Sequence, residues 1–413
     1  MVLGFCVCGT ASMSWATYSR VESMGKSADF FMDDISIFDN PANMNVFPNF
    51  LIGELGTYRQ DTSAAAAAIK NQDPANSWFG GIFSYAFVKE KQPGKLYPQV
   101  SLGGAFNRKD EELFRLLPDS ANGKLVPEPA TNFDGFLGMA LTNGGMLGSH
   151  VYVAVEEGAD SRGADSKFGT VAAHDPGVNV YVLRGDLGVN WPIAKNVDGE
   201  FSFGLASIDY GPKKIDPEFS YFVRGRAYSH LNVINGELVP LFIYSVLQAP
   251  GQSYTKLHLG MGVNVPLDRG FFWLGVQGLF DEMDQTGIIR ANGKISYYSD
   301  SSAIKAKETI RGGMISFGIE RNFWFDWLVL RVGGQKEITH RAVEDQGQDY
   351  SYIYTNPTGD GTAGDHVGFG IGVNVEEKLK IDATLAENIP YTFGAFSGPT
   401  HHLISRISAT YSF

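Results

Sequence analysis

The chain has few cysteines and no long apolar run, and both shortages narrow its class. Of 413 residues only Cys6 and Cys8 are cysteines. Their spacing is too short for the usual zinc or redox motifs, so we expect no metal site. No apolar run approaches the roughly 18 residues of a membrane-spanning helix. No sustained helical heptad and no interdomain linker is present either, which leaves a β-rich chain as the main alternative.

Charge is also sparse and mostly acidic. Charged residues make up 19% of the chain, and the formal net charge is -12 at pH 7. This balance argues against a nucleic-acid partner, which selects for basic faces. The sequence contains no phosphate-binding loop, no nucleotide fingerprint and no nucleophile motif before a helix. We therefore expect neither catalytic residues nor a cofactor, and no enzymatic activity.

What the chain does have is a strict two-residue alternation at its end. One side of the final segment is apolar and the other is polar, with Ile404 and Ser405 as exceptions. The apolar side contains Leu403, Ile407, Ala409, Tyr411 and Phe413, and the polar side contains Arg406, Ser408, Thr410 and Ser412. Such a segment is a strand with one apolar face.

The same alternation recurs at 179–191, 253–265, 365–375 and 378–387. A soluble sandwich would show it too, so composition has to decide. The chain has 49 glycines and 13% aromatic residues, and its mean hydropathy is only -0.10. Small inward residues and aromatic girdles are typical of membrane barrels. We therefore predict an all-β fold, a transmembrane antiparallel β-barrel.

Long and short connections alternate along the second half of the chain. Residues 388–400, 342–364 and 282–308 are long connections, whereas 376–377, 323–325 and 268–269 are short. Barrels of bacterial outer membranes have long external loops and short periplasmic turns. The count indicates 14–16 strands beginning near Phe50, although 250–252 is short where a long loop is expected. The segment Glu111 to Leu117 is predicted to form a short amphipathic helix at the outer rim.

Both ends of the chain indicate export. Residues 1–16 end in Ser14-Trp15-Ala16, a pattern like a signal-peptidase site, but they lack the usual basic start. We interpret them as an atypical signal peptide. The final strand resembles the closing strand of Gram-negative outer-membrane barrels, whose terminal aromatic helps the assembly machinery recognise its client. The matching assembly signal here is Phe413, Tyr411, Ala409 and Ile407.

The segment between the signal peptide and the first strand contains Met24-Gly25, Asp33-Asp34 and Asn40-Pro41-Ala42, in that order. This segment resembles the N-terminal plug of the long-chain fatty-acid transporter family and of its relative, the shuttle protein of type IX secretion. Lys26 departs from the glycine of the family's first element. The resemblance covers both chain ends and not the middle. It implies a signal peptide at 1–16, a plug at 17–48 and a barrel at 49–413, with Asp33, Asp34, Asn40, Pro41 and Ala42 as plug residues.

The composition of this segment fits a plug inside a barrel. Pro41 fixes its own φ and pushes Asn40 toward extended or turning backbone. Phe30, Phe31 and Phe38 alternate with polar spacers and need to be covered. Folding into the barrel mouth would cover them, and so would packing as a strand or helix beneath the barrel floor.

The polar faces of the predicted strands give candidates for the lumen. Both signs of charge occur, so pairing across the lumen is one explanation, and ion selectivity would need one sign to dominate. The candidates are Arg184, Asp186, Arg224, Arg226, Lys256, His258, Glu320, Lys380, Asp382 and Arg406.

These patterns together predict a barrel of the bacterial outer membrane. The resemblance implies passive diffusion of hydrophobic or amphiphilic small molecules past the plug. A docking or shuttle barrel for secreted or surface proteins and a general porin are the alternatives. The expected partners are membrane lipid, lipopolysaccharide, the barrel assembly machinery and a hydrophobic small-molecule ligand, and no nucleic acid.

Overall fold

A computed structural model describes residues 17–26, 28–56, 77–87, 97–118, 120–129, 131–156, 178–210, 219–291, 294–298, 305–323, 325–345, 348–354, 366–376, 378–385 and 404–413. The predicted signal peptide lies outside these residues. No helix among the described residues is long and apolar enough to cross a membrane.

The described residues form one large antiparallel sheet of 17 strands. Its strands are β1 (Phe50–Gly56), β2 (Trp78–Ala86), β3 (Gln99–Phe106), β6 (Thr131–Ala140), β7 (Met146–Glu156), β8 (Val180–Ala194), β9 (Val197–Asp209), β10 (Phe219–Leu231), β11 (Gly236–Ala249), β12 (Gln252–Leu267), β13 (Gly270–Thr286), β16 (Lys305–Asn322), β17 (Leu328–Asp345), β18 (Gln348–Tyr354), β19 (His366–Val375), β20 (Leu379–Leu385) and β21 (Ile404–Ser412).

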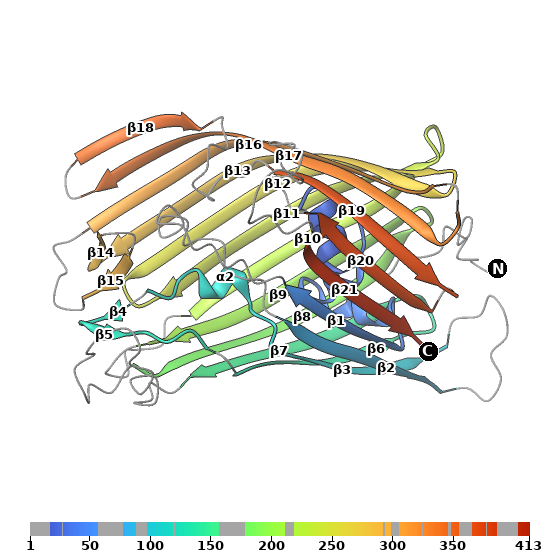
Figure 1. The fold of residues 1–413 in the computed structure, drawn as a ribbon, viewed down its shortest axis with the longest axis horizontal. Coiled ribbons are helices and arrows are strands. Elements are labelled where there is room, and N and C mark those ends of the chain that lie inside the picture. Colours follow the sequence, from blue (N-terminus) through green and yellow to red (C-terminus); the bar gives the residue numbers. More distant parts are fainter. Residues whose placement is uncertain are drawn as a thin grey trace.

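The sheet closes on itself, because β21 pairs with β1 from Phe50 opposite Ser412 to Gly56 opposite Arg406. Strands β18 and β19 both pair with β17, at residues 339–345 and 328–335 respectively. They therefore share one position in the wall, and the 17 strands make a 16-position barrel (Figure 1). The prediction of an antiparallel barrel with 14–16 strands is confirmed, at the upper end of its range.

The two ends of the barrel differ, as Figure 1 shows. One end holds the C-terminus and tight turns such as 195–196 and 268–269. The other holds a small sheet of β4 (Ser120–Ala121), β5 (Lys124–Leu125), β14 (Ile288–Ala291) and β15 (Lys294–Tyr297). In this sheet β15 pairs in parallel with β4, so two connections far apart in sequence meet there. The connection at 250–251 stays short at this end.

Side chains alternate apolar-out and polar-in along the wall. On β8 the outward Leu183 and Leu187 are 53% and 64% exposed, whereas the inward Arg184 and Asp186 are 8% and 4% exposed. A soluble sandwich buries its apolar face, so this arrangement is the reverse of one. It is the pattern of a barrel with lipid outside and a polar interior.

Aromatic side chains gather on the outside at the end that holds the C-terminus. Tyr85 packs edge-on against Phe87, and Phe325 stacks on Trp327. Phe413 lies 5.4 Å from Phe83, ring to ring, and remains 53% exposed. This is the place of an interfacial aromatic girdle.

Candidate functional site: the lumen and the segments inside it

The N-terminal segment, residues 17–49, lies against inward-facing side chains of the barrel. It contains α1 (Tyr18–Ser23) and two 3-10 helices, η1 (Asp34–Phe38) and η2 (Pro41–Asn45), seen as blue coils among the strands in Figure 1. Asn40 and Pro41 explain where η2 begins. The Asn40 side chain accepts the Ala42 N–H at 3.1 Å, and Pro41 occupies the first helical position.

Glycines on the inner wall make room for this segment. Phe30 packs over Gly260, Gly262 and Gly275, and a Cβ at any of them would collide with its ring. Gly148 and Gly188 make the same room for Asn40 and Pro41, and Gly318 and Gly333 for Met24. The wall is therefore shaped around the path of the segment.

A buried ion network attaches α1 to the wall. Arg20 donates from Nε to Glu320 of β16 at 2.6 Å and from Nη1 to Asp33 at 3.2 Å. Glu320 also accepts from Arg331 of β17 at 2.5 Å. Arg331 reaches Asp382 of β20 at 2.6 Å. The network ties the segment to three strands at once.

Two adjacent carboxyls of the segment lie beside this network. Asp33 and Asp34 are 0% and 1% exposed. Burial raises the pKa of Asp34 well above its ordinary value, and the neighbouring Asp33 raises it further. Burial also raises the pKa of Asp33, against the opposing effect of Arg20. Burial alone would lower the pKa of Arg20, but Glu320 and Asp33 raise it, so Arg20 keeps its charge.

Strand β10 holds the middle of the segment through two arginines. Arg224 contacts Asp29 at 2.8 Å and Asp39 at 3.0 Å. Arg226 pairs with Glu200 of β9 at 2.5 Å. Its Nη1 also donates to the backbone carbonyls of residues 28, 29 and 31 at 3.1–3.3 Å. One cation that binds three backbone carbonyls fixes the path of the main chain. This contact does not depend on which side chains the segment carries.

Amide side chains hold η2. Asn40 donates to Asn190 of β8 at 2.6 Å, and Asn190 donates to Asn43 at the same distance. Asn45 donates to the Leu147 carbonyl and accepts from Ser101, both at 3.0 Å. The Asn-Pro-Ala motif thus contacts the barrel wall directly.

A second segment enters from the opposite end. Its helix α2 (Glu111–Phe114) buries Leu113 and Leu116 completely. The prediction of a helix at the outer rim was wrong in place, because these apolar residues pack on inward wall residues such as Tyr152 and Val182. Leu113 and Leu116 are therefore not presented to solvent.

Ion pairs hold this second segment too. Arg108 binds Asp134 of β6 through two nitrogens, at 2.7 and 3.0 Å. Arg184 reaches Asp110 at 3.0 Å. The Arg108 guanidinium also lies 4.0 Å from the ring centre of Phe38 in η1, so the two internal segments touch each other.

His150 of β7 links these pairs. Its Nε2 lies 2.8 Å from Asp134 and its Nδ1 lies 2.7 Å from Asp186. Its ring stacks on Phe136 with centres 4.6 Å apart. With both ring nitrogens occupied by carboxylates, the imidazole is a structural connector between two strands. Among the described residues no three His, Cys, Asp or Glu side chains are placed to hold a metal ion.

The structure places all ten predicted lumen residues on inward positions. Besides the contacts above, His258 pairs with Asp281 at 3.0 Å, Lys256 with Glu112 at 3.3 Å, and Arg406 with Glu54 at 3.3 Å and Glu22 at 3.5 Å. Some of these charges thus pair with charges on neighbouring strands of the wall, and others pair with the two internal segments. Lys380 is buried beside Asp382.

Several residues of the site were not predicted from the sequence. Arg331, Asp134 and His150 lie at inward positions of their strands, so the same alternation could have identified them. Asp29 and Arg108 lie in connecting segments, where polar and apolar side chains do not alternate regularly. No local signal marks them.

No family model matches the chain, and no curated protein matches it. Among solved structures it is similar to CdiB from Escherichia coli, with 10% identity, coverage of 89% of this chain and a TM-score of 0.40. The chain spans 63% of that protein. BamA from Haemophilus ducreyi lacking POTRA domains 1-3 aligns with 88% of this chain and 70% of its own, at 9% identity and a TM-score of 0.37. The monoaromatic hydrocarbon channel TodX aligns with 96% of this chain and 98% of its own, at 10% identity and 0.37. All three are outer-membrane β-barrels.

Proposed function

We propose that the protein is a gated barrel of the bacterial outer membrane that passes hydrophobic or amphiphilic small molecules by diffusion, with residues 17–48 as its plug. The observation that carries the proposal is the way in which the segment is held. It crosses the interior and is anchored to the wall by Arg20–Glu320, Arg224–Asp29 and Asn40–Asn190. Ion pairs and amide hydrogen bonds exchange with water when they break. The apolar side chains of the segment belong to a buried cluster with wall residues, so they must stay covered while the plug shifts.

In this function, side chains of the interior hold the plug against the wall, release it and close the far end of the barrel. The ion network at Arg20 keeps the plug docked, and the inner glycines accept Phe30 and Met24. The helix α2 closes the far end through Arg108–Asp134. A molecule crosses after both segments shift. We propose no catalytic step, no cofactor and no metal.

Planar-bilayer conductance of the mature chain, with and without residues 23–44, tests the plug. We expect a silent intact barrel and a conducting deletion variant. Because α2 also fills the interior, a second variant replaces 109–117 with a glycine–serine linker in the deletion background. A conducting intact barrel would instead identify a general porin. If every variant stays silent, the transport proposal fails. Liposome uptake of an alkane-tailed dye by the conducting variant then tests the class of cargo.

A docking barrel for secreted or surface proteins is the second candidate, and one observation favours it. The described interior is filled from both ends, and the two segments meet at Arg108 and Phe38. A permanently closed barrel would serve as a platform in the membrane. Silence of all three variants in the bilayer, together with capture of an exported protein in a cross-linked complex, would support this function.

A further inference from the structure

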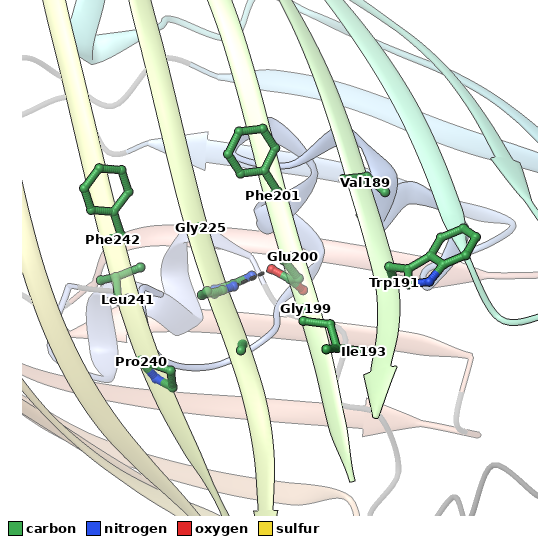
Figure 2. A pocket seen from close by; sticks show the side chains of 12 residues that line it. Val189, Trp191, Ile193, Gly199, Glu200, Phe201, Gly225, Pro240, Leu241 and Phe242 are labelled. Carbon is green, nitrogen blue, oxygen red and sulfur yellow. Dashed lines mark hydrogen bonds and ion pairs between the residues drawn. The ribbon is translucent and has the colours of Figure 1, made fainter. Parts of the chain in front are cut away.

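The outer surface of the barrel has a hollow where two glycines, an alanine and a proline lie next to one another. Gly199 on β9, Gly225 and Ala227 on β10, and Pro240 on β11 are neighbours that line a pocket of about 430 Å³ (Figure 2). Their neighbours along the wall carry large side chains. The hollow is of the size that small-molecule sites have in proteins, roughly 300–1,000 Å³.

The hydrogen-bond ladder is interrupted beneath this hollow. Strands β10 and β11 pair as far as Arg226 opposite Leu241 and resume only at Ser229 opposite Leu238. Pro240 lies in the gap and has no N–H to donate. The wall is therefore less tightly joined at the floor of the hollow than elsewhere along these strands.

The sides of the hollow are apolar and outward-facing. Ile193 of β8 lies over Gly199 on one side, where the ring of Trp191 is turned toward Gly145. Phe201 rises from β9, and Phe242 bounds the hollow on the other side (Figure 2). Trp191 is 43% exposed and Ile193 67% exposed. The hollow opens on the same surface as the apolar belt of the barrel, and hydrocarbon is the neighbour of that surface in a membrane.

An exposed cation follows the hollow along the chain of β8. Lys195 is exposed on the turn directly after β8, two residues beyond Ile193. This turn lies at the end with the C-terminus and the aromatic girdle. An apolar slot that leads to an interfacial lysine suits a lipid with an acyl tail and an anionic phosphate.

We infer that this hollow over β8–β11 is a binding site for one glycerophospholipid, whose acyl chain lies over Gly225 and whose phosphate meets Lys195. The inference rests on the proposed placement in a membrane. The floor residue Gly225 precedes Arg226, which binds the plug carbonyls. A seated chain therefore packs on the strand that holds the plug from within.

The test is photolabelling by phosphatidylglycerol that carries a diazirine in mid-chain, in reconstituted full-length protein. We expect labelled peptides from β8, β9 and β11 to exceed those from the rest of the belt several-fold. Gly225→Phe fills the hollow and should remove the excess. A Cβ at Gly225 has no neighbour closer than 3.9 Å, so a side chain can begin there without a shift of the backbone. Gly185→Phe is the matched control, because a Cβ there also meets nothing closer than 3.9 Å.

Lys195→Glu should weaken labelling by phosphatidylglycerol. Uniform labelling of the belt in the unmodified protein would overturn the site, whatever the variants do. Equal excess in Gly225→Phe and Gly185→Phe would also overturn it, as would preferred labelling by a lipopolysaccharide probe. A protein that takes up no lipid label at all would instead refute the membrane placement.

Discussion

Removal of Arg20 should loosen the N-terminal segment far more than removal of a surface arginine. Arg20 pairs with Glu320 and Asp33, and the side chains of all three are at most 7% exposed. Arg20→Met keeps most of the volume and leaves Asp33 without its cation. Breaking a buried pair by removing one partner costs about 3–5 kcal/mol. If this free energy is lost from the docked state alone, the population of the undocked segment should rise roughly 100- to 4,000-fold, at about 1.4 kcal/mol per tenfold change.

Thiol labelling of a single cysteine measures that population. Ser23 is 0% exposed in α1, so Ser23→Cys should react only when the segment leaves the wall. Cys6 and Cys8 are replaced by serine in this background. We expect Arg20→Met to speed labelling by at least two orders of magnitude within that range.

Arg269→Met is the control for this experiment, because Arg269 and Asp326 form an ion pair at 3.1 Å with exposures of 55% and 86%. Pairs of that kind contribute about 0–1 kcal/mol. Equal labelling rates in the parent, Arg20→Met and the control would refute the claim that the ion network holds the segment. Heat-modifiable migration on a gel checks that each barrel is folded.

Three further predictions concern the same interior. Because the pKa of Asp34 is raised in the docked state, docking is fully stabilised below the ordinary pKa and weakens as pH rises through the raised value. The labelling rate of Ser23→Cys, divided by the rate of a free thiol at the same pH, should therefore rise with pH, and Asp34→Asn should flatten that ratio. Asn190→Ala removes the hydrogen bonds to Asn40 and Asn43 and should destabilise docking by about 1–3 kcal/mol, seen as faster labelling of a cysteine at Ala42, whereas an unchanged rate would contradict the contact. Gly262→Leu should displace Phe30 and open the segment, and Phe30→Ala in the same chain should restore slow labelling; a failure of this rescue would show that the ring does not occupy that space.

The sequence predicts which side chains face inward, because a strand alternates regardless of what lies beside it. Arg184 and Asp186 are two residues apart, and both lie inward. Their partners are another matter. Arg226 binds carbonyls almost 200 residues earlier in the chain, and the path of the segment across the lumen decides which ones. No local pattern records that path.

The two connections at the far end show the same limit. Strands β4 and β15 pair over two residues each, Ser296 opposite Ser120 and Tyr297 opposite Ala121. Strands this short have no detectable period. The position of α2 inside the barrel likewise depends on a long-range contact, Arg184 with Asp110, because its sequence pattern equally fits a helix on the rim.

The longest-range contacts of the segment bear on the order in which the molecule is built. Thr17 bonds Ser408, 391 positions later, and Thr384 bonds the Ser19 carbonyl, 365 positions away. Ser408 lies on β21, which leaves the ribosome last and completes the seam with β1, and Thr384 lies on the neighbouring β20. The first described residues of the chain are therefore the last to gain their native neighbours. Closure of the wall and docking of the segment form one late, high-contact-order event. Until the final strand arrives, Thr17 lacks Ser408, and Glu22 and Glu54 lack Arg406.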